Sequence, residues 1–301
     1  MEHKREFNQG ASYWVQVDNH SVTTLSELQE KYQLSDEMLT YSLDKNERAR
    51  VEYDPEEHAF LLVYNVPHRH KTDNHYETSP MTFIIKEHHL FSFTTEHTSY
   101  VADMMENLLH KNSKQSEYSL LFHTLFLISD SFFPLIEEVN SERMRLNQKL
   151  REKTTNKNLL ELSDLEIGLV YLVTATKQNA VLLQQIRALN IFHRLQDNEK
   201  EQLEDALIEA KQAVEMTNLA AQVIDQLSGA YNNLLNNNLN DTMKFLTIWS
   251  LLLTVPTIVT GFFGMNVPLP FSHSVFGWGI AMLISIGLSV WMLLAMWRRI
   301  K

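Results

Sequence analysis

Residues 262–271 read FFGMNVPLPF, a Gly-Met-Asn triplet followed by two prolines, with no charged residue among them. This stretch joins two apolar runs, Phe245 to Phe263 and Val275 to Trp297. The runs have about 19 and about 23 residues, and each can cross a hydrocarbon core of about 30 Å as a helix. Because the connector is short, the sequence predicts a transmembrane helical hairpin near the C-terminus.

Charge sets the expected orientation of this hairpin. Lys244 precedes the first run and RRIK (298–301) follows the second, whereas the connector has neither lysine nor arginine. Basic residues flanking membrane spans stay on the cytoplasmic side. We therefore expect a multi-pass protein of the cell membrane, inner or plasma, with both termini in the cytoplasm and the connector outside.

The rest of the chain is strongly acidic. Of 26 basic and 37 acidic residues, only four basic ones and no acidic ones lie from Met243 onward. Residues 1–242 therefore hold 22 basic and 37 acidic residues, a formal charge of −15. Such a body repels nucleic acid, which we do not expect as a partner, and it attracts cations. An ordinary solvated acidic surface would have the same composition.

Several kinds of chemistry are missing from the sequence. The chain has no cysteine, so disulfides and thiolate sites are excluded. It also has no phosphate-binding glycine loop, no HExxH pair and no evident Ser/His/Asp set. We therefore expect that the protein is not an enzyme and uses no organic cofactor.

The N-terminal part has a mixed α/β pattern between residues 12 and 100. Four segments rich in β-branched and aromatic residues predict strands: SYWVQV (12–17), AFLLVYNV (59–66), MTFIIK (81–86) and HLFSFTT (89–95). A helical stretch from Leu25 to Leu43 lies between the first two, with Ser35 and Asp36 as an internal break and cap. Residues 69–80 read as a hairpin loop.

From about Tyr100 the apolar residues repeat with the period of a helix. Polar segments at 151–158 and 194–200 predict turns between helices. From Glu199 onward no strong helix breaker occurs before the membrane. This predicts a continuous helix of roughly 60 residues, about 90 Å at about 1.5 Å per residue, which would form a stalk.

A polar stripe follows the first membrane run. Steps of three and four give a series in which all but the methionine are small or polar: Asn240, Met243, Thr247, Ser250, Thr254, Thr257 and Gly261. The stripe is either a packing seam between membrane helices or the wall of a pore. A pore needs several copies, because one hairpin cannot enclose a water-filled path. Pro256 is either an ordinary membrane-helix proline or a gating hinge.

These residues resemble the CorA family of magnesium channels. The resemblance rests on Gly264-Met265-Asn266 between two C-terminal spans, on MKFLTIW (243–249) opening the first span, and on the basic tail. Residues 34–66 and 81–96 of the head are also similar, so the resemblance covers most of the chain. It implies an αβα cytoplasmic head, a long stalk helix, a two-helix transmembrane hairpin and a funnel-shaped assembly.

The resemblance also implies a homopentamer in a lipid bilayer, whose first spans line a pore for hydrated Mg²⁺, with Co²⁺ and Ni²⁺ as further ions. It places the selectivity filter on Gly264, Met265 and Asn266, with the Asn266 amides meeting the ion at the outer mouth. The pore ring at the inner mouth falls on Asn240, the hydrophobic constriction on Met243 and Leu246, and deeper polar rings on Thr254 and Thr257. The family often has an acidic residue after the triplet, which this chain lacks.

Regulation by the transported ion is a further implication of the resemblance. In the family, cytoplasmic Mg²⁺ bridges acidic residues of neighbouring subunits and holds the channel closed. Carried over onto this chain, the bridging acids fall on Asp205, Glu204 and Glu201 of the stalk and on Glu56, Glu57 and Asp54 of the head. Solvated helix charges without a metal are the alternative. A further acid that the family often carries falls on Gly229.

We expect these domains: a cytoplasmic α/β domain (1–118), a helical stalk domain (119–242), a pore-lining span (243–263), an external loop (264–274), a second span (275–297) and a basic tail (298–301). Two other functions remain open. One is a zinc-transporting relative, in which the methionine of the triplet tends to be replaced. The other is a membrane-tethered sensor or scaffold that conducts no ion.

Overall fold

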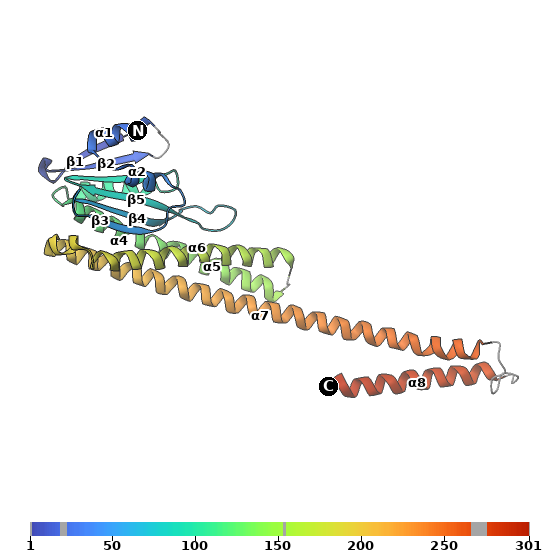
Figure 1. Cartoon of the computed structure of the whole chain (residues 1–301). Coiled ribbons are helices and arrows are strands. Elements are labelled where there is room, and N and C mark those ends of the chain that lie inside the picture. The colour runs from blue at the N-terminus through green and yellow to red at the C-terminus, as the bar shows by residue number, and fades with distance from the viewer. Residues whose placement is uncertain (1, 19–22, 153–154, 266–275, 301) are drawn as a thin grey trace. The chain divides into compact units, whose positions relative to one another are not determined.

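The computed structural model describes residues 2–18, 23–152, 155–265 and 276–300. The chain divides into two compact units, Met1–Ser228 and Gly229–Lys301. Figure 1 labels the elements of both units. Each unit is described separately below.

The first unit contains a mixed sheet, which among the described residues has six strands: β1 (Glu2–Phe7), β2 (Ser12–Asp18), β3 (Arg50–Asp54), β4 (Ala59–Pro67), β5 (Thr78–Lys86) and β6 (His89–Thr94). The strand order is β1-β2-β6-β5-β4-β3. Only the pairing of β2 with β6 is parallel, and the other four pairings are antiparallel.

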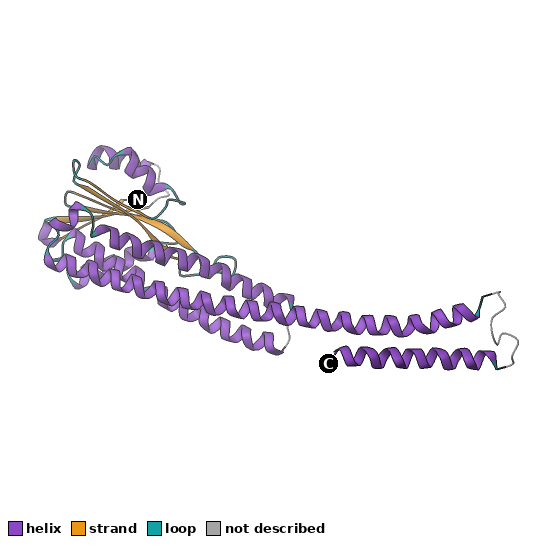
Figure 2. Ribbon diagram, turned by 60° about the horizontal axis from the view of Figure 1, so that its bottom comes forward, coloured by secondary structure: helices purple, strands orange, loops and turns teal. Residues whose placement is uncertain are grey.

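Helices cover both faces of this sheet, as Figure 2 shows. The short helices α1 (Thr23–Tyr32) and α2 (Asp36–Leu43) lie on one face. The helices α3 (Tyr100–Lys111), α4 (Glu117–Asp130) and α6 (Asn156–Ile186) pack against the other face. Because helices exclude water from both sides, every residue of the inner strand β4 is buried. The head is thus an αβα sandwich.

The longer helices continue from the head. α5 (Phe132–Glu152) and α6 pack against each other, and a short 3-10 helix, η2 (Asn190–Arg194), leads into α7 (Asp197–Phe263). Gly168 on α6 allows the β4–β5 loop to approach closely, since a Cβ there would lie 3.1 Å from the Tyr76 backbone nitrogen. α7 has 67 residues and crosses the boundary between the two units.

A buried asparagine attaches α6 to the sheet. β3 pairs with β4 only along Ala59–Val63, so the same edge of β4 is left without a strand partner at Asn65. The Asn65 N–H donates to Asn179 Oδ1 (2.9 Å), and Asn179 Nδ2 donates to the Asn65 carbonyl (2.8 Å). Asn179 is 1% exposed. Its amide thus satisfies two backbone groups that would otherwise be buried without a partner.

A second buried group connects the starts of two helices. Ser116 is the N-cap residue of α4 and accepts a hydrogen bond from the Ser119 N–H. The same hydroxyl donates to the carboxylate of Glu199 in the first turn of α7. That carboxylate also accepts from the Gln196 N–H (2.7 Å), as in a capping box. One buried carboxylate therefore fixes both helix N-termini.

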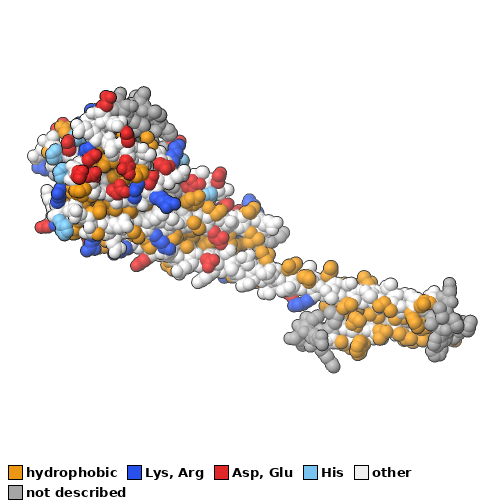
Figure 3. Space-filling model, viewed as in Figure 1, with side chains coloured by type: hydrophobic (Ala, Val, Ile, Leu, Met, Phe, Trp, Pro, Cys, Tyr) orange, Lys and Arg blue, Asp and Glu red, His pale blue; other side chains and the backbone are white. Residues whose placement is uncertain are grey.

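The second unit contains the last part of α7 and the helix α8 (Gly277–Ile300), which run side by side in Figures 1 and 2. Both are long and apolar enough to cross a membrane. In Figure 3 the charged colours gather mainly over the first unit, whereas hydrophobic and uncharged atoms predominate on the visible face of this hairpin.

The α4–α5 segment (Glu117–Glu152) is also long and apolar enough to span a membrane. However, 56% of its most apolar window is buried inside the protein, compared with 11% for α7 and 6% for α8. Packing in the head therefore accounts for the apolar character of α4, whereas the most apolar stretches of α7 and α8 lack such cover among the described residues.

The four predicted strands and the broken helix at 25–43 are confirmed, and the Ser35 hydroxyl accepts from the Met38 N–H at the predicted cap. The long helix extends to Phe263 as predicted. Two strands were not predicted, β1 and β3. The predicted start of the second span at Val275 lies outside the described residues.

Candidate ion pathway and regulatory acids

The predicted pore-lining residues lie on one exposed face of α7. In the single chain all eight are exposed: Asn240, Met243, Leu246, Thr247, Ser250, Thr254, Thr257 and Gly261. The roughly opposite face contains the side chains that are buried or half-buried: Ile248, Leu251, Leu252, Val255, Pro256, Val259 and Phe263. The stripe is therefore available to another copy of the chain or to water.

The threonine hydroxyls of the stripe are bonded within the helix. Thr247, Thr254 and Thr257 each donate to the carbonyl four residues earlier, at 2.8, 2.7 and 2.8 Å. A hydroxyl that donates in this way keeps its lone pairs as acceptors. Water bound to a cation donates hydrogen bonds, so these oxygens suit a hydrated cation. The same internal bonds also lower the cost of a threonine in an apolar surrounding, which suits a packing seam.

α7 continues through Pro256 without a break and ends at the triplet. The Gly264 N–H donates to the Thr260 carbonyl (2.9 Å), and the Met265 N–H to the Phe262 carbonyl (3.4 Å). A Cβ on Gly264 would lie 3.1 Å from the Thr260 oxygen, so this position favours glycine because of close backbone contact. Met265 is exposed. Asn266, the central residue of the predicted filter, lies outside the described residues.

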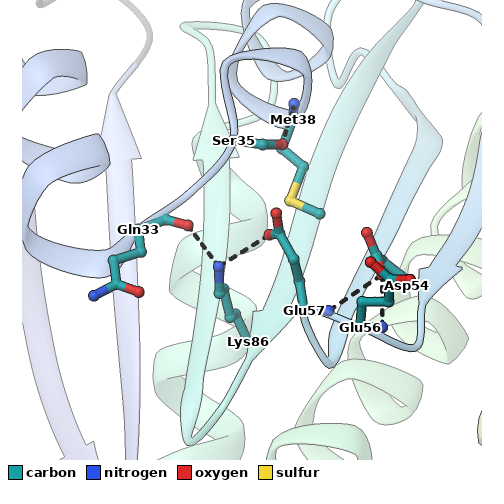
Figure 4. A network of polar contacts seen from close by, with 7 residues as sticks. All are labelled: Gln33, Ser35, Met38, Asp54, Glu56, Glu57 and Lys86. Carbon is teal, nitrogen blue, oxygen red and sulfur yellow. Dashed lines mark hydrogen bonds and ion pairs between the residues drawn. The ribbon is translucent and has the colours of Figure 1, made fainter.

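The three candidate acids of the head surround the tight turn between β3 and β4 (Figure 4). Asp54 Oδ1 accepts the backbone N–H groups of Glu56 (2.8 Å) and Glu57 (3.2 Å). The Glu57 carboxylate pairs with Lys86 Nζ on β5 at 3.0 Å, and that ammonium also donates to the Gln33 carbonyl. Among the described residues the Glu56 carboxylate forms no ion pair, so it is the head acid best placed to meet a metal ion.

The three candidate acids of the stalk lie in the first turns of α7. Glu201 and Asp205 are exposed, and Glu204 Oε2 lies 3.4 Å from an Arg187 nitrogen. Burial lowers the pKa of His123 on α4, while a backbone hydrogen bond at Ser119 and the Asp205 carboxylate act in the opposite direction.

The structure does not bring the head and stalk acids together in one chain. Tyr53 on β3 accepts a hydrogen bond from Arg194 of η2 (3.0 Å), so its side chain faces the helices that lead to α7. Asp54 is the next strand residue, and successive side chains point to opposite faces of a sheet. In the described part of the chain no cluster of three or more acidic or histidine side chains could hold a metal ion. A bridge between these acids therefore needs a second copy.

His68 is a buried histidine directly after the end of β4. It is 4% exposed, its Nε2 lies 2.7 Å from Ser79 Oγ, and its ring stacks on His97 with centroids 4.2 Å apart. Within the described residues its Nδ1 has no hydrogen-bond partner. Burial, together with the neighbouring His97, lowers the pKa of His68.

Sequence reasoning missed the ion pair between Glu57 and Lys86. The partners are 29 residues apart, and only the pairing of β4 with β5 brings them together. It also missed the role of Glu199, although Gln196 and Glu199 have the spacing of a capping box.

Comparison with known proteins gives concordant matches. Residues 9–301 match the family model described as CorA-like Mg²⁺ transporter protein. The chain is 24% identical over 281 residues to the cobalt/magnesium transport protein CorA of Methanocaldococcus jannaschii, covering 91% of this chain and 86% of that protein.

Solved structures show the same fold. The complete CorA magnesium transporter of Methanocaldococcus jannaschii is similar with a TM-score of 0.78 at 22% identity, covering 98% of this chain and 92% of that one. Full-length CmaX is similar with a TM-score of 0.68 at 16% identity, covering 92% and 87%. The fold predicted for the head, stalk helix and C-terminal apolar hairpin is therefore confirmed.

Proposed function

The chain belongs to the CorA-like Mg²⁺ transporter family, a family of membrane-embedded transporters rather than enzymes, and from this membership we propose that it forms a homopentameric channel for hydrated Mg²⁺. Ions would pass down their electrochemical gradient into the cytoplasm. The observation that carries the proposal is the exposed polar stripe of α7, on the face of the helix roughly opposite its buried side chains.

The chemistry of the stripe suits an ion that keeps its water. Mg²⁺ is small and loses its coordinated waters reluctantly. Carboxylates would bind it tightly and slow its release, whereas conduction needs weak contacts at several levels. Carboxamide oxygens at Asn240 and Asn266, and hydroxyl oxygens at Thr254 and Thr257, would accept hydrogen bonds from the hydrated ion. Gly264 and Met265 would complete the filter at the outer mouth.

We further propose that cytoplasmic Mg²⁺ closes the channel by bridging acids of neighbouring copies. The stalk would contribute Asp205 with Glu204 and Glu201, and the head would contribute Glu56 with Asp54 and Glu57. Glu56 and Asp205 form no ion pair within the described residues, which favours them as the bridging pair. Without Mg²⁺ the −15 charge of residues 1–242 would push the copies apart.

Flux measured in vesicles tests the proposal. Purified protein is reconstituted in liposomes containing a Mg²⁺-sensitive dye, and influx of Mg²⁺, Co²⁺, Ni²⁺ and Zn²⁺ is compared at several internal Mg²⁺ concentrations. We expect Mg²⁺ influx that falls as internal Mg²⁺ rises. Influx of Zn²⁺ alone would favour a zinc transporter. A monomer or dimer by mass measurement in detergent, together with no influx, would favour a non-conducting scaffold.

A further inference from the structure

α7 contains a run of asparagines just before the polar stripe. Six of the nine residues from 232 to 240 are asparagine, and all six are exposed: Asn232, Asn233, Asn236, Asn237, Asn238 and Asn240. Asparagine is a poor helix former, because its side chain competes for backbone hydrogen bonds. Helix stability therefore does not account for this run.

Two of these asparagines continue the polar stripe toward the cytoplasm. Steps of four and three back from Asn240 reach Asn236 and Asn233. Two series of residues spaced seven apart result. One contains Asn233, Asn240 and Thr247, and the other contains Asn236, Met243 and Ser250. Since residues seven apart lie almost on one line of a helix, Asn233 and Asn236 share the exposed face of the stripe. Asn238 is about 200° around the helix from Asn236 at about 100° per residue.

The extended stripe carries no charge. From Gly229 to Gly261 the positions reached by these steps include no acidic or basic residue. The nearest charged residues, Asp241 and Lys244, lie off the stripe and pair with each other at 2.9 Å. An ion that leaves the hydroxyls of the span toward the cytoplasm would therefore meet amide oxygens and no charge on this face.

We propose that Asn233 and Asn236 form two further rings of carboxamide groups below Asn240, giving the pore an uncharged cytoplasmic vestibule for the hydrated divalent cation. This inference rests on the proposed function, because rings form only where several copies of α7 face one axis. Each amide oxygen would accept a hydrogen bond from a water of the ion, and no water would need to leave. The ion would be held weakly at successive levels and released without a trapping charge.

The lack of cysteine makes a direct test possible, since single cysteines can be introduced without removing others. Asn233→Cys, Asn236→Cys and the control Asn238→Cys are reconstituted and treated with a cationic thiosulfonate reagent, and labelling is measured by mass spectrometry. We expect labelling to reduce Mg²⁺ influx at least tenfold for the first two variants. Influx through labelled Asn238→Cys should stay within twofold of the untreated variant.

A second set of variants separates a role in the ion path from a structural role. Asn236→Lys should reduce Mg²⁺ influx at least tenfold, because a ring of ammonium groups repels the ion. Asn238→Lys should stay within threefold of the unmodified protein. Equal influx through Asn236→Lys and Asn238→Lys, or a thiol at 233 and 236 that the reagent cannot reach, would overturn the vestibule while leaving a conducting channel. Absence of influx in the unmodified protein would instead overturn the proposed function itself.

Discussion

Single side chains hold the head together at points that no periodic pattern reveals. Asn179 lies on the buried face of α6 among apolar residues and accounts for both backbone groups of Asn65. Its importance depends on β3 ending early, so that β4 lacks a partner there. Sequence reasoning could place Asn179 on a helix but could not identify its partner 114 residues away.

Replacing Asn179 by alanine should therefore destabilise the head. Two buried backbone groups lose their partners, which should cost about 2 to 4 kcal/mol of unfolding free energy. Urea unfolding of the purified protein, followed by circular dichroism, measures the loss. Gln178→Ala is the matched control, because its side chain is exposed and, within the described residues, bonds only the Asn65 side-chain amide. We expect less than about 1 kcal/mol there, and equal losses would contradict this explanation.

His68 should make the head less stable in mild acid. Its folded-state pKa is lowered, mainly by burial, so the unfolded chain binds the proton more readily. Stability is then greatest when the histidine is neutral, and it falls as pH drops below the unfolded value of about 6.5. We expect a larger fall in Tm between pH 7.5 and 5.5 for the unmodified protein than for His68→Gln.

His70→Gln is the control for this pH effect, because His70 is close in sequence but exposed. Its Tm should fall between pH 7.5 and 5.5 by as much as that of the unmodified protein. If His68→Gln behaves in the same way, His68 is not the source of the pH dependence.

At the scale of whole elements, the sequence predicted the inner strands and missed the two edges of the sheet. β2, β6, β5 and β4 are buried and rich in apolar residues. β1 (EHKREF) and β3 (RVEYD) carry several charges. Edge strands have one unpaired side, and charges there discourage pairing with other chains. Pattern analysis missed β1 and β3 because of these charges. The charges are expected, since both strands lie at the edges of the sheet.

The paired starts of α4 and α7 give a prediction at the same scale. Glu199→Ala removes the acceptor for Ser116 and for the Gln196 N–H, and should cost about 2 kcal/mol in urea unfolding. Asp197→Ala changes a fully exposed carboxylate in the same turn and should reduce the unfolding free energy less than Glu199→Ala does. A smaller loss for Glu199→Ala than for Asp197→Ala would show that the buried carboxylate does not fix these helix ends.

At the scale of the whole molecule, the sequence could place the stripe residues on one helix face, but it could not give the partners of the candidate regulatory acids. The pore stripe depends on one helix, and helix periodicity alone places its residues on one face. The acids come from two elements, and their partners depend on folding. Glu57 forms an ion pair with Lys86. The Asp54 side chain points to the face of the sheet opposite to the helices that lead to α7. Sequence similarity alone could not choose among these carboxylates.

Removing the favoured pair of acids should weaken protection by Mg²⁺. In Glu56→Gln with Asp205→Asn, the Mg²⁺ concentration that gives half-maximal resistance to trypsin should rise about tenfold, the effect of losing a coupling of about 1.4 kcal/mol. Glu30→Gln with Asp103→Asn removes the same charge from exposed sites of the head. Equal protection of the two double variants would exclude Glu56 and Asp205 as bridging residues.

Pro256 has a consequence for how such an assembly could move. Proline has no N–H to donate to the Leu252 carbonyl, so α7 lacks one backbone hydrogen bond there, although the helix continues. If identical copies surround an axis, this compliant turn recurs at one depth in all of them. The weakened turns of all copies would then lie at the level of Thr254 and Thr257. Bending of the helices there would change the width of the opening at that depth, while the turns on either side stay rigid.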